Sequence, residues 1–382
     1  MGVNFEEKLR NQQYDDLWQE YCGFLDLDIG GYMQIQRRLM EEQIGLWSAS
    51  ALGKKLLDGG RPRTVEEFRR AVPLTTFEDF YAAVKGQVKY AIDECHANLL
   101  ICEKILAEQF NLPTFTVLLD GALERAKDAT AGGAKVNIGP TMQMVGFATM
   151  VDSVAAIKKV VFDDKKITME RLCDALDANF EGYDDVYHLL NKAPKFGNDD
   201  DYVDLLLRDV LTEMCHFIKQ FKIYKNARNS CSSIIMTANI PYGAILGATP
   251  DGRKAGEPIA EGGISPHQGR NISGVTSTFR SVAKLDQVLL ANGSILNVRV
   301  SPELVKNETG LRNFAMMLRT FCENGGNLVQ FNFTSNEMLR EAQKFPEKYK
   351  DLLVRVATYS AYFTELSPDL QNNIIERSEC VR

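Results

Sequence analysis

Apolar residues recur every three or four positions through much of this chain, and that spacing predicts amphipathic helices. The segments with this spacing are 34–44, 90–126, 142–161, 170–179, 202–224 and 310–322. The residues expected on the buried side of the long helix 202–224 are Leu205, Leu206, Val210, Met214, Phe217 and Ile218. Helices therefore dominate the predicted secondary structure.

Three short runs rich in β-branched and aromatic residues are expected to be strands. They cover 233–237, 294–300 and 327–333. The helical segment 310–322 lies between the last two, and a strand–helix–strand order is typical of neighbouring parallel strands. The pattern as a whole predicts an α/β fold.

The composition is that of a globular protein with enough apolar residues for a large core. The chain has 382 residues, of which 45% are hydrophobic, and a formal charge of −7. Acidic and basic residues are interspersed, so neither a nucleic acid nor an anionic membrane is expected as a partner. The first residues lack the basic start and apolar run of a secretory signal, and no later apolar run is long enough to cross a bilayer. We therefore expect a cytoplasmic protein.

The spacing of cysteine and histidine indicates no metal site. The 8 cysteines are scattered without a close pair, which argues against a zinc site and against a disulfide framework. The 4 histidines do not fall into a metal-binding spacing. No constellation of serine, histidine and carboxylate can be placed either, so a conventional hydrolase is disfavoured. We expect neither a bound metal nor a bound cofactor.

One long string stands out from this background. Residues 247–258 read GATPDGRKAGEP, and GGISP follows at 262–266. Within the first string, Pro250, Asp251 and Gly252 have the fixed φ, the side-chain acceptor and the permissive backbone of a tight turn. A phosphate-binding loop is disfavoured, because no glycine-lysine-serine/threonine arrangement opens a helix here. We therefore predict a structural turn.

These strings, together with VRVATYSA at 354–361, resemble the signature motifs of the glycyl radical enzymes. Further similar strings follow in the order of the family and lie at 124–135, 179–183, 193–200, 281–297, 329–332 and 370–377. The resemblance covers about 88–382. It is closer to the diol dehydratase, decarboxylase and aryl-succinate synthase branches than to pyruvate formate-lyase.

The resemblance implies a particular architecture. The family fold is a ten-stranded α/β barrel built from two five-stranded halves, and this chain is similar to its C-terminal part. Residues 88–382 would form the partial barrel, with the radical-loop region at about 330–382, and 1–87 would be an added helical N-terminal segment. Half a barrel exposes unpaired strand edges and an apolar inner face. We therefore expect either the N-terminal helices or another chain to cover it.

The resemblance also implies roles for four residues. Members of the family store an unpaired electron on the α-carbon of a buried glycine and pass it to a cysteine thiol, whose thiyl radical takes hydrogen from the substrate. Thr358 stands at the glycine position, with Arg355 and Tyr359 beside it in the loop. Arg377 matches an arginine that approaches the active site in several members.

Two parts of that reaction do not match this sequence. Glycine suits radical storage because its α-carbon can flatten and its backbone tolerates any φ, whereas threonine is branched and carries a hydroxyl that needs a partner when buried. We therefore expect Thr358 to hold no radical, in a pocket shaped for glycine. The family's thiyl loop, glycine-cysteine-x-glutamate, does not occur in the printed sequence either.

The resemblance thus predicts a homologue of radical lyases and dehydratases that cleave or form C–O, C–N or C–C bonds, without catalysis by this chain as it stands. One alternative is a non-catalytic interaction module or split-enzyme half. Another is a truncated or chimeric product. The expected partners are a second copy of the chain or a complementing chain with the N-terminal half. Active relatives also meet a separate radical-SAM activase.

Overall fold

The computed structural model describes residues 76–380 except 223, 224, 226, 235, 236 and 378. The predicted helix 34–44 and most of the segment 1–87 lie outside these residues. By its internal contacts the chain divides into two units, Met1–Cys102 and Glu103–Arg382. The division 1–87 and 88–382 stays a prediction.

The described part of the first unit is one long helix that continues into the second. Helix α6 (Phe77–Gln109) begins after Thr76, whose hydroxyl accepts a hydrogen bond from the Asp79 backbone N–H at 3.1 Å and donates one to the Asp79 carboxylate at 2.7 Å. This reciprocal pair caps the helix N-terminus.

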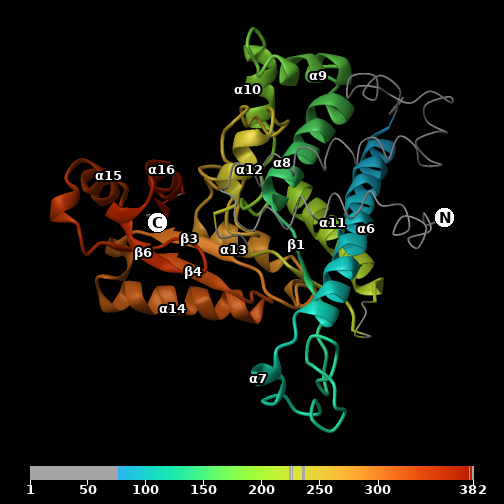
Figure 1. The fold of residues 1–382 in the computed structure, drawn as a ribbon. Helices are drawn as coiled ribbons and strands as arrows, with labels where there is room; N and C mark the ends of the chain where they lie inside the picture. The colour runs from blue at the N-terminus through green and yellow to red at the C-terminus, as the bar shows by residue number, and fades with distance from the viewer. Residues whose placement is uncertain (1–75, 223–224, 226, 235–236, 378, 381–382) are drawn as a thin grey trace. The chain divides into compact units, whose positions relative to one another are not determined.

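Most of the regular secondary structure of the second unit is helical (Figure 1). The helices are α7 (Pro113–Thr116), α8 (Phe147–Ile157), α9 (Met169–Asp177), α10 (Asp184–Lys192), α11 (Asp201–Gln220), α12 (Asn239–Ile245), α13 (Val275–Ala283), α14 (Glu308–Glu323), α15 (Asn336–Lys344) and α16 (Pro368–Glu376). A π-helical turn, Lys158–Asp163, extends α8, and four 3-10 turns lie at Gln287–Leu289, Pro302–Val305, Pro346–Lys348 and Phe363–Glu365.

The strands are short and most pair in parallel. Strand β1 (Thr141–Gln143) pairs with β2 (Ser230–Ser232), and β3 (Leu296–Val300) lies between β4 (Val329–Asn332) and β7 (Glu379–Cys380). A parallel bridge from Ser233 to Ser294 connects the end of β2 to the start of β3. The two remaining strands, β5 (Leu353–Arg355) and β6 (Ser360–Tyr362), form an antiparallel hairpin.

The core is built around α8 and α11, which pack against each other (Figure 1). Nine of the eleven residues of α8 are buried, so this helix is enclosed on nearly all sides. Helix α11 is amphipathic, and its buried residues are Val203, Asp204, Leu207, Val210, Leu211, Met214, Cys215 and Ile218. Asp204 enters this face because Lys284 and Ser281 both donate to its carboxylate, at 2.7 and 2.9 Å.

Much of the predicted order is confirmed. The segments 170–179, 202–224 and 310–322 correspond to α9, α11 and α14, and the last lies between the parallel strands β3 and β4 as expected. The mixture of helices with parallel strand pairs confirms the α/β class.

The structure corrects several predictions in detail. The helix expected over 90–126 ends at Gln109, and after α7 the segment 117–126 consists of turns. The helix expected from residue 142 starts at Phe147, because 141–143 pairs with β2. Of the strand expected at 233–237, residues 235 and 236 lie outside the described residues, Ser233 forms a single bridge to Ser294, and the strand β2 itself is Ser230–Ser232. On α11, Leu205 points outward and is 39% exposed, whereas Leu207 was missed and is fully buried.

The contrast between these two leucines gives a matched pair for measuring the core. We expect Leu207→Ala to lower the free energy of unfolding by about 2–5 kcal/mol, because it removes buried methyl groups and leaves a cavity. Leu205→Ala, two positions away on the same helix, is expected to cost about 1 kcal/mol or less. Urea unfolding of the two variants measures both values, and equal losses would mean that the buried face of α11 is assigned wrongly.

Candidate functional site

The hairpin of β5 and β6 carries the radical-loop string. The backbone N–H of Val356 donates to the carbonyl oxygen of Tyr359 at 3.0 Å, so Ala357 and Thr358 are the two central residues of its turn. Val356 and Ala357 are fully buried, whereas Thr358 and Tyr359 are exposed. The expectation of a glycine-shaped pocket around Thr358 is therefore wrong for this structure.

The backbone of this turn does not require glycine. All residues of the hairpin are described, and none of them has a φ in the left-handed region. A threonine can therefore occupy position 358 without backbone strain. Glycine at this position would therefore differ from threonine in its chemistry and not in its backbone conformation. Its α-carbon carries a removable hydrogen and no branched side chain.

Asn332, at the end of β4, fastens the hairpin to the parallel sheet. Its side-chain amide donates to the carbonyl oxygen of Arg355 and its amide oxygen accepts from the Arg355 backbone N–H, both at 2.6 Å. The Arg355 guanidinium donates to Gln330 Oε1 of the same strand at 3.2 Å and lies 3.5 Å from Ser360 Oγ. Arg355 thus joins β5 to both β4 and β6.

Arg377, directly after α16, holds the turn from its buried side. Its guanidinium donates to the carbonyl oxygen of Val356 at 2.7 Å and to that of Arg355 at 3.3 Å. The same group forms an ion pair with Glu261 at 3.1 Å, and the side chains are only 6% and 5% exposed. Burial raises the pKa of the Glu261 carboxyl, and the charge of Arg377 and a hydrogen bond from Asn297 at 2.7 Å oppose that rise.

Two glycines after Glu261 let it approach the sheet. Gly262 and Gly263 have φ values of +69° and +77°. A β-carbon on Gly263 would lie 1.9 Å from the carbonyl oxygen of Ser233, and one on Gly262 would lie 2.7 Å from the Asn297 amide nitrogen. Only glycine permits this backbone to pass so close to its neighbours.

A small polar cavity lies beside the ion pair. Its volume is about 20 Å³, and its lining residues include Glu261, Gln268, Asn297 and Arg377. Three buried atoms among them have no hydrogen-bond partner, namely Gln268 Oε1, Asn297 Oδ1 and Arg377 Nε. The volume matches a single water molecule with three polar neighbours. It is too small for a substrate.

The loop 247–258 is a structural turn, as predicted. Gly252, at φ +91°, donates its N–H to the carbonyl oxygen of Thr249 at 3.0 Å. Arg253 is fully buried, and the acceptors of its guanidinium are the hydroxyl of Thr249 and the carbonyl oxygens of Gly243, Leu246, Gly247 and Glu257. The guanidinium of Arg253 thus donates mainly to backbone oxygens, and these hydrogen bonds stabilise the loop.

The structure therefore brings the four predicted site residues into one region. Arg355, Thr358 and Tyr359 belong to the hairpin, and Arg377 bonds to its base. The sequence reasoning missed Glu261, Asn297 and Asn332, which hold these residues in place. Of these, Asn332 could have been found, since it is a polar residue near the end of the predicted strand 327–333, where polar side chains reach neighbouring loops.

Among the residues that the structure describes, no three or more His, Cys, Asp or Glu side chains are grouped to hold a metal ion. In the same part of the chain, no helix has the length and apolar character needed to cross a membrane.

Comparison with known proteins gives two family matches in series. The model of pyruvate formate lyase-like proteins matches residues 56–243, and the model of the glycine radical domain matches 260–364. The first match begins within the segment 1–87, and the second contains the hairpin.

Individual relatives agree with these matches. The chain is 39% identical over 305 residues to trans-4-hydroxy-L-proline dehydratase of Clostridioides difficile, covering 80% of this chain and 38% of that protein. It is 35% identical over 307 residues to isethionate sulfite-lyase of Nitratidesulfovibrio vulgaris, covering 79% and 37%. The glycerol-bound B12-independent glycerol dehydratase of Clostridium butyricum superposes with a TM-score of 0.78 at 35% identity, covering 90% and 42%.

The chain thus spans less than half the length of each of these proteins. Within that span, the family models, the relatives and the fold around the hairpin all agree, and the chain belongs to the glycyl radical enzyme family.

Proposed function

We propose that this chain is a homologue of the radical lyases and dehydratases whose own hairpin holds no radical. The observation that carries the proposal is Thr358 in the turn of a hairpin that lies within the match to the glycine radical domain. The reaction class comes from the relatives, two of which are named as dehydratases and one as a lyase. The bonds that this chain's homologues are proposed to cleave or form include C–O, C–N and C–C bonds.

The chemistry of position 358 supports the absence of a radical. A radical on an α-carbon is stabilised when that carbon is planar and conjugated with both flanking amides. The branched side chain of threonine crowds such a planar centre, whereas glycine leaves it free. Thr358 is also exposed, so a carbon radical there would be open to oxygen.

We further propose that the fold is the C-terminal part of a ten-stranded α/β barrel. The parallel pairs β1–β2 and β3–β4 support this proposal, as does the superposition on glycerol dehydratase. No cofactor is proposed for this chain. In active relatives the radical is made by a separate radical-SAM activase, and we keep the cytoplasm as the proposed compartment.

Arg377 is proposed to act as a positioning residue for the hairpin. Its guanidinium contacts the carbonyl oxygens of Arg355 and Val356, the two residues that lead into the turn. The neighbouring cavity has room for one water molecule, which favours a role in shaping the loop over direct binding of a substrate.

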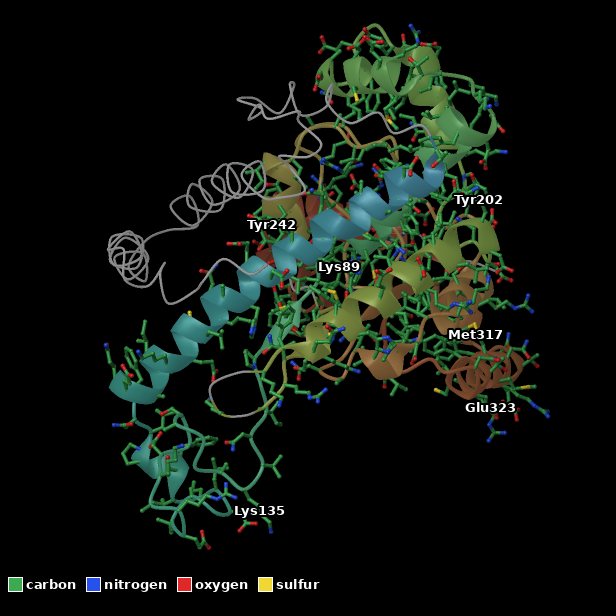
Figure 2. The ribbon with its side chains drawn as sticks, turned by 90° about the vertical axis from the view of Figure 1, so that its right-hand side faces the viewer. Lys89, Lys135, Tyr202, Tyr242, Met317 and Glu323 are labelled. Atoms are coloured by element: carbon green, nitrogen blue, oxygen red, sulfur yellow. The ribbon has the colours of Figure 1, made fainter. Side chains whose placement is uncertain are left out.

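A second candidate function is that of a complementing half, docking onto a chain with the thiyl cysteine loop or onto a second copy. Apolar side chains that face outward favour it. Leu311 and Met316 of α14, the helix on which Figure 2 labels Met317 and Glu323, are more than half exposed, and so is Leu353 of the hairpin. Such side chains would be covered if the surface that carries them formed part of an interface.

The proposed lack of a radical can be tested by electron paramagnetic resonance. We expect no glycyl doublet when the chain is treated anaerobically with a relative's radical-SAM activase and S-adenosylmethionine, because Thr358 cannot hold the radical. Trans-4-hydroxy-L-proline dehydratase serves as the positive control for its activase, and Thr358→Gly is the matched variant of this chain. A doublet from the unaltered chain, or cleavage of its backbone at position 358 after exposure to oxygen, would refute the proposal.

The role of Arg377 predicts a particular pH dependence. In Arg377→Gln, the buried Glu261 loses its charge partner, so its pKa rises further above the unfolded value. A raised carboxyl pKa contributes stability that is complete at low pH and is lost as pH rises through the folded-state pKa. We therefore expect the variant to lose about 3–5 kcal/mol of unfolding free energy at pH 8 and clearly less at pH 5.

The double variant Glu261→Gln/Arg377→Gln is the control, because neither member of the ion pair carries a charge in it. Its urea midpoint is expected to change between pH 5 and pH 8 no more than that of the unaltered chain. Hydrogen exchange of the 354–361 amides should quicken in both variants, since both lose the arginine. If the stability of the single and the double variant changed with pH in the same way, Arg377 would not be the charge partner that controls the pKa of Glu261.

A further inference from the structure

The segment 110–138, which we call the lobe, exposes an unusual amount of apolar surface. It contains α7 and the turns after it (Figure 1), and Figure 2 labels its residue Lys135. Eight large apolar side chains in it are between 49% and 78% exposed. They are Phe110, Leu112, Phe115, Val117, Leu118, Leu123, Val136 and Ile138.

Polar contacts hold the lobe together. The Asp128 carboxylate accepts hydrogen bonds from the Leu112 backbone N–H at 3.1 Å, the Thr116 hydroxyl at 2.7 Å, and the backbone and hydroxyl of Thr130 at 2.9 and 2.6 Å. These bonds, those of the Thr130 and Thr116 hydroxyls first, lower the pKa of Asp128 to about 2. Arg125 adds a bond to the carbonyl oxygen of Ala134 at 2.5 Å.

The lobe therefore lacks an apolar core of its own. The residues that it buries are small, Thr116, Ala122 and Gly133, and its large apolar side chains face outward. A free surface rarely carries so many apolar side chains close together. Because the hydrogen bonds around Asp128 already fix the backbone, little ordering would be needed on binding, which favours docking.

The charges of the lobe indicate what kind of partner fits. It carries three acidic and three basic residues, so it has no net charge to attract a nucleic acid or an anionic membrane. Aromatic and aliphatic side chains with few charges are typical of the centre of a protein–protein interface. The relatives supply a candidate surface. This chain matches 38% of trans-4-hydroxy-L-proline dehydratase and 42% of glycerol dehydratase, so more than half of each polypeptide lies outside the matched part.

We propose that the lobe is the docking surface for the portion of a glycyl radical enzyme polypeptide that this chain does not match. This inference rests on the second candidate function, a complementing half, and assigns the surface through which it works. The partner contributes an apolar, uncharged protein surface that covers the eight side chains of the lobe.

The test compares two double variants with the same chemistry. Leu118→Ser/Ile138→Ser removes apolar surface from the lobe, where the side chains are 78% and 77% exposed. Ile272→Ser/Val288→Ser removes similar side chains outside it, 86% and 85% exposed. The probe is the part of C. difficile trans-4-hydroxy-L-proline dehydratase outside the matched region, expressed as a separate polypeptide. Overlapping synthetic peptides of that region replace it if it does not fold.

We expect the full chain to bind the probe, with Kd raised at least about tenfold by the lobe variant and less than about twofold by the control variant. The 110–138 amides should exchange more slowly in the complex. Equal Kd values for the two variants would overturn the lobe assignment while leaving the complementing role intact. No binding by the unaltered chain to the probe or peptides would remove that role and the lobe assignment together. A third outcome would also overturn the proposal: the chain self-associates, only the lobe variant abolishes this, and probe binding is unchanged. The lobe would then be an interface between two copies of this chain.

Discussion

The buried ion pair of Arg377 and Glu261 is the interaction on which the geometry of the hairpin depends. Neither charge can be left alone at this depth, since an unpaired buried charge costs several kcal/mol. The pair therefore fixes three segments at once: the glycine loop that carries Glu261, the end of α16 that carries Arg377, and the turn whose carbonyl oxygens receive the guanidinium. Asn297 adds β3 to this arrangement by donating to the same carboxylate.

This arrangement separates the shape of the hairpin from its chemistry. Arg377 and Asn332 contact only backbone atoms and other side chains of the site, and none of their bonds involves the residue at position 358. The turn avoids the left-handed region, so it accepts threonine as readily as glycine. A change at position 358 can therefore remove radical storage and leave the fold of the site as it was.

The sequence predicted best where local periodicity and tertiary packing agree. The β3–α14–β4 unit followed from two strand-like runs around a helical one, and the turn at Gly252 followed from its residue types. The sequence predicted poorly where a residue distant in the chain determines the local structure. Residues 141–143 become a strand because β2 lies beside them, and Glu261 becomes central because Arg377, far away in the sequence, reaches it. Neither partner leaves a local signal.

The prediction of one continuous helix beyond Gln109 to residue 126 failed for a more specific reason. Apolar spacing predicts a helix because it is assumed that the apolar residues belong to the chain's own core. In the lobe they face outward, while Asp128, Thr116 and Thr130 hold the backbone in turns through their side chains. Side chains meant for an external surface and side chains meant for a core look the same in a sequence. The failure of periodicity at this segment is itself an argument that its apolar residues serve an interface.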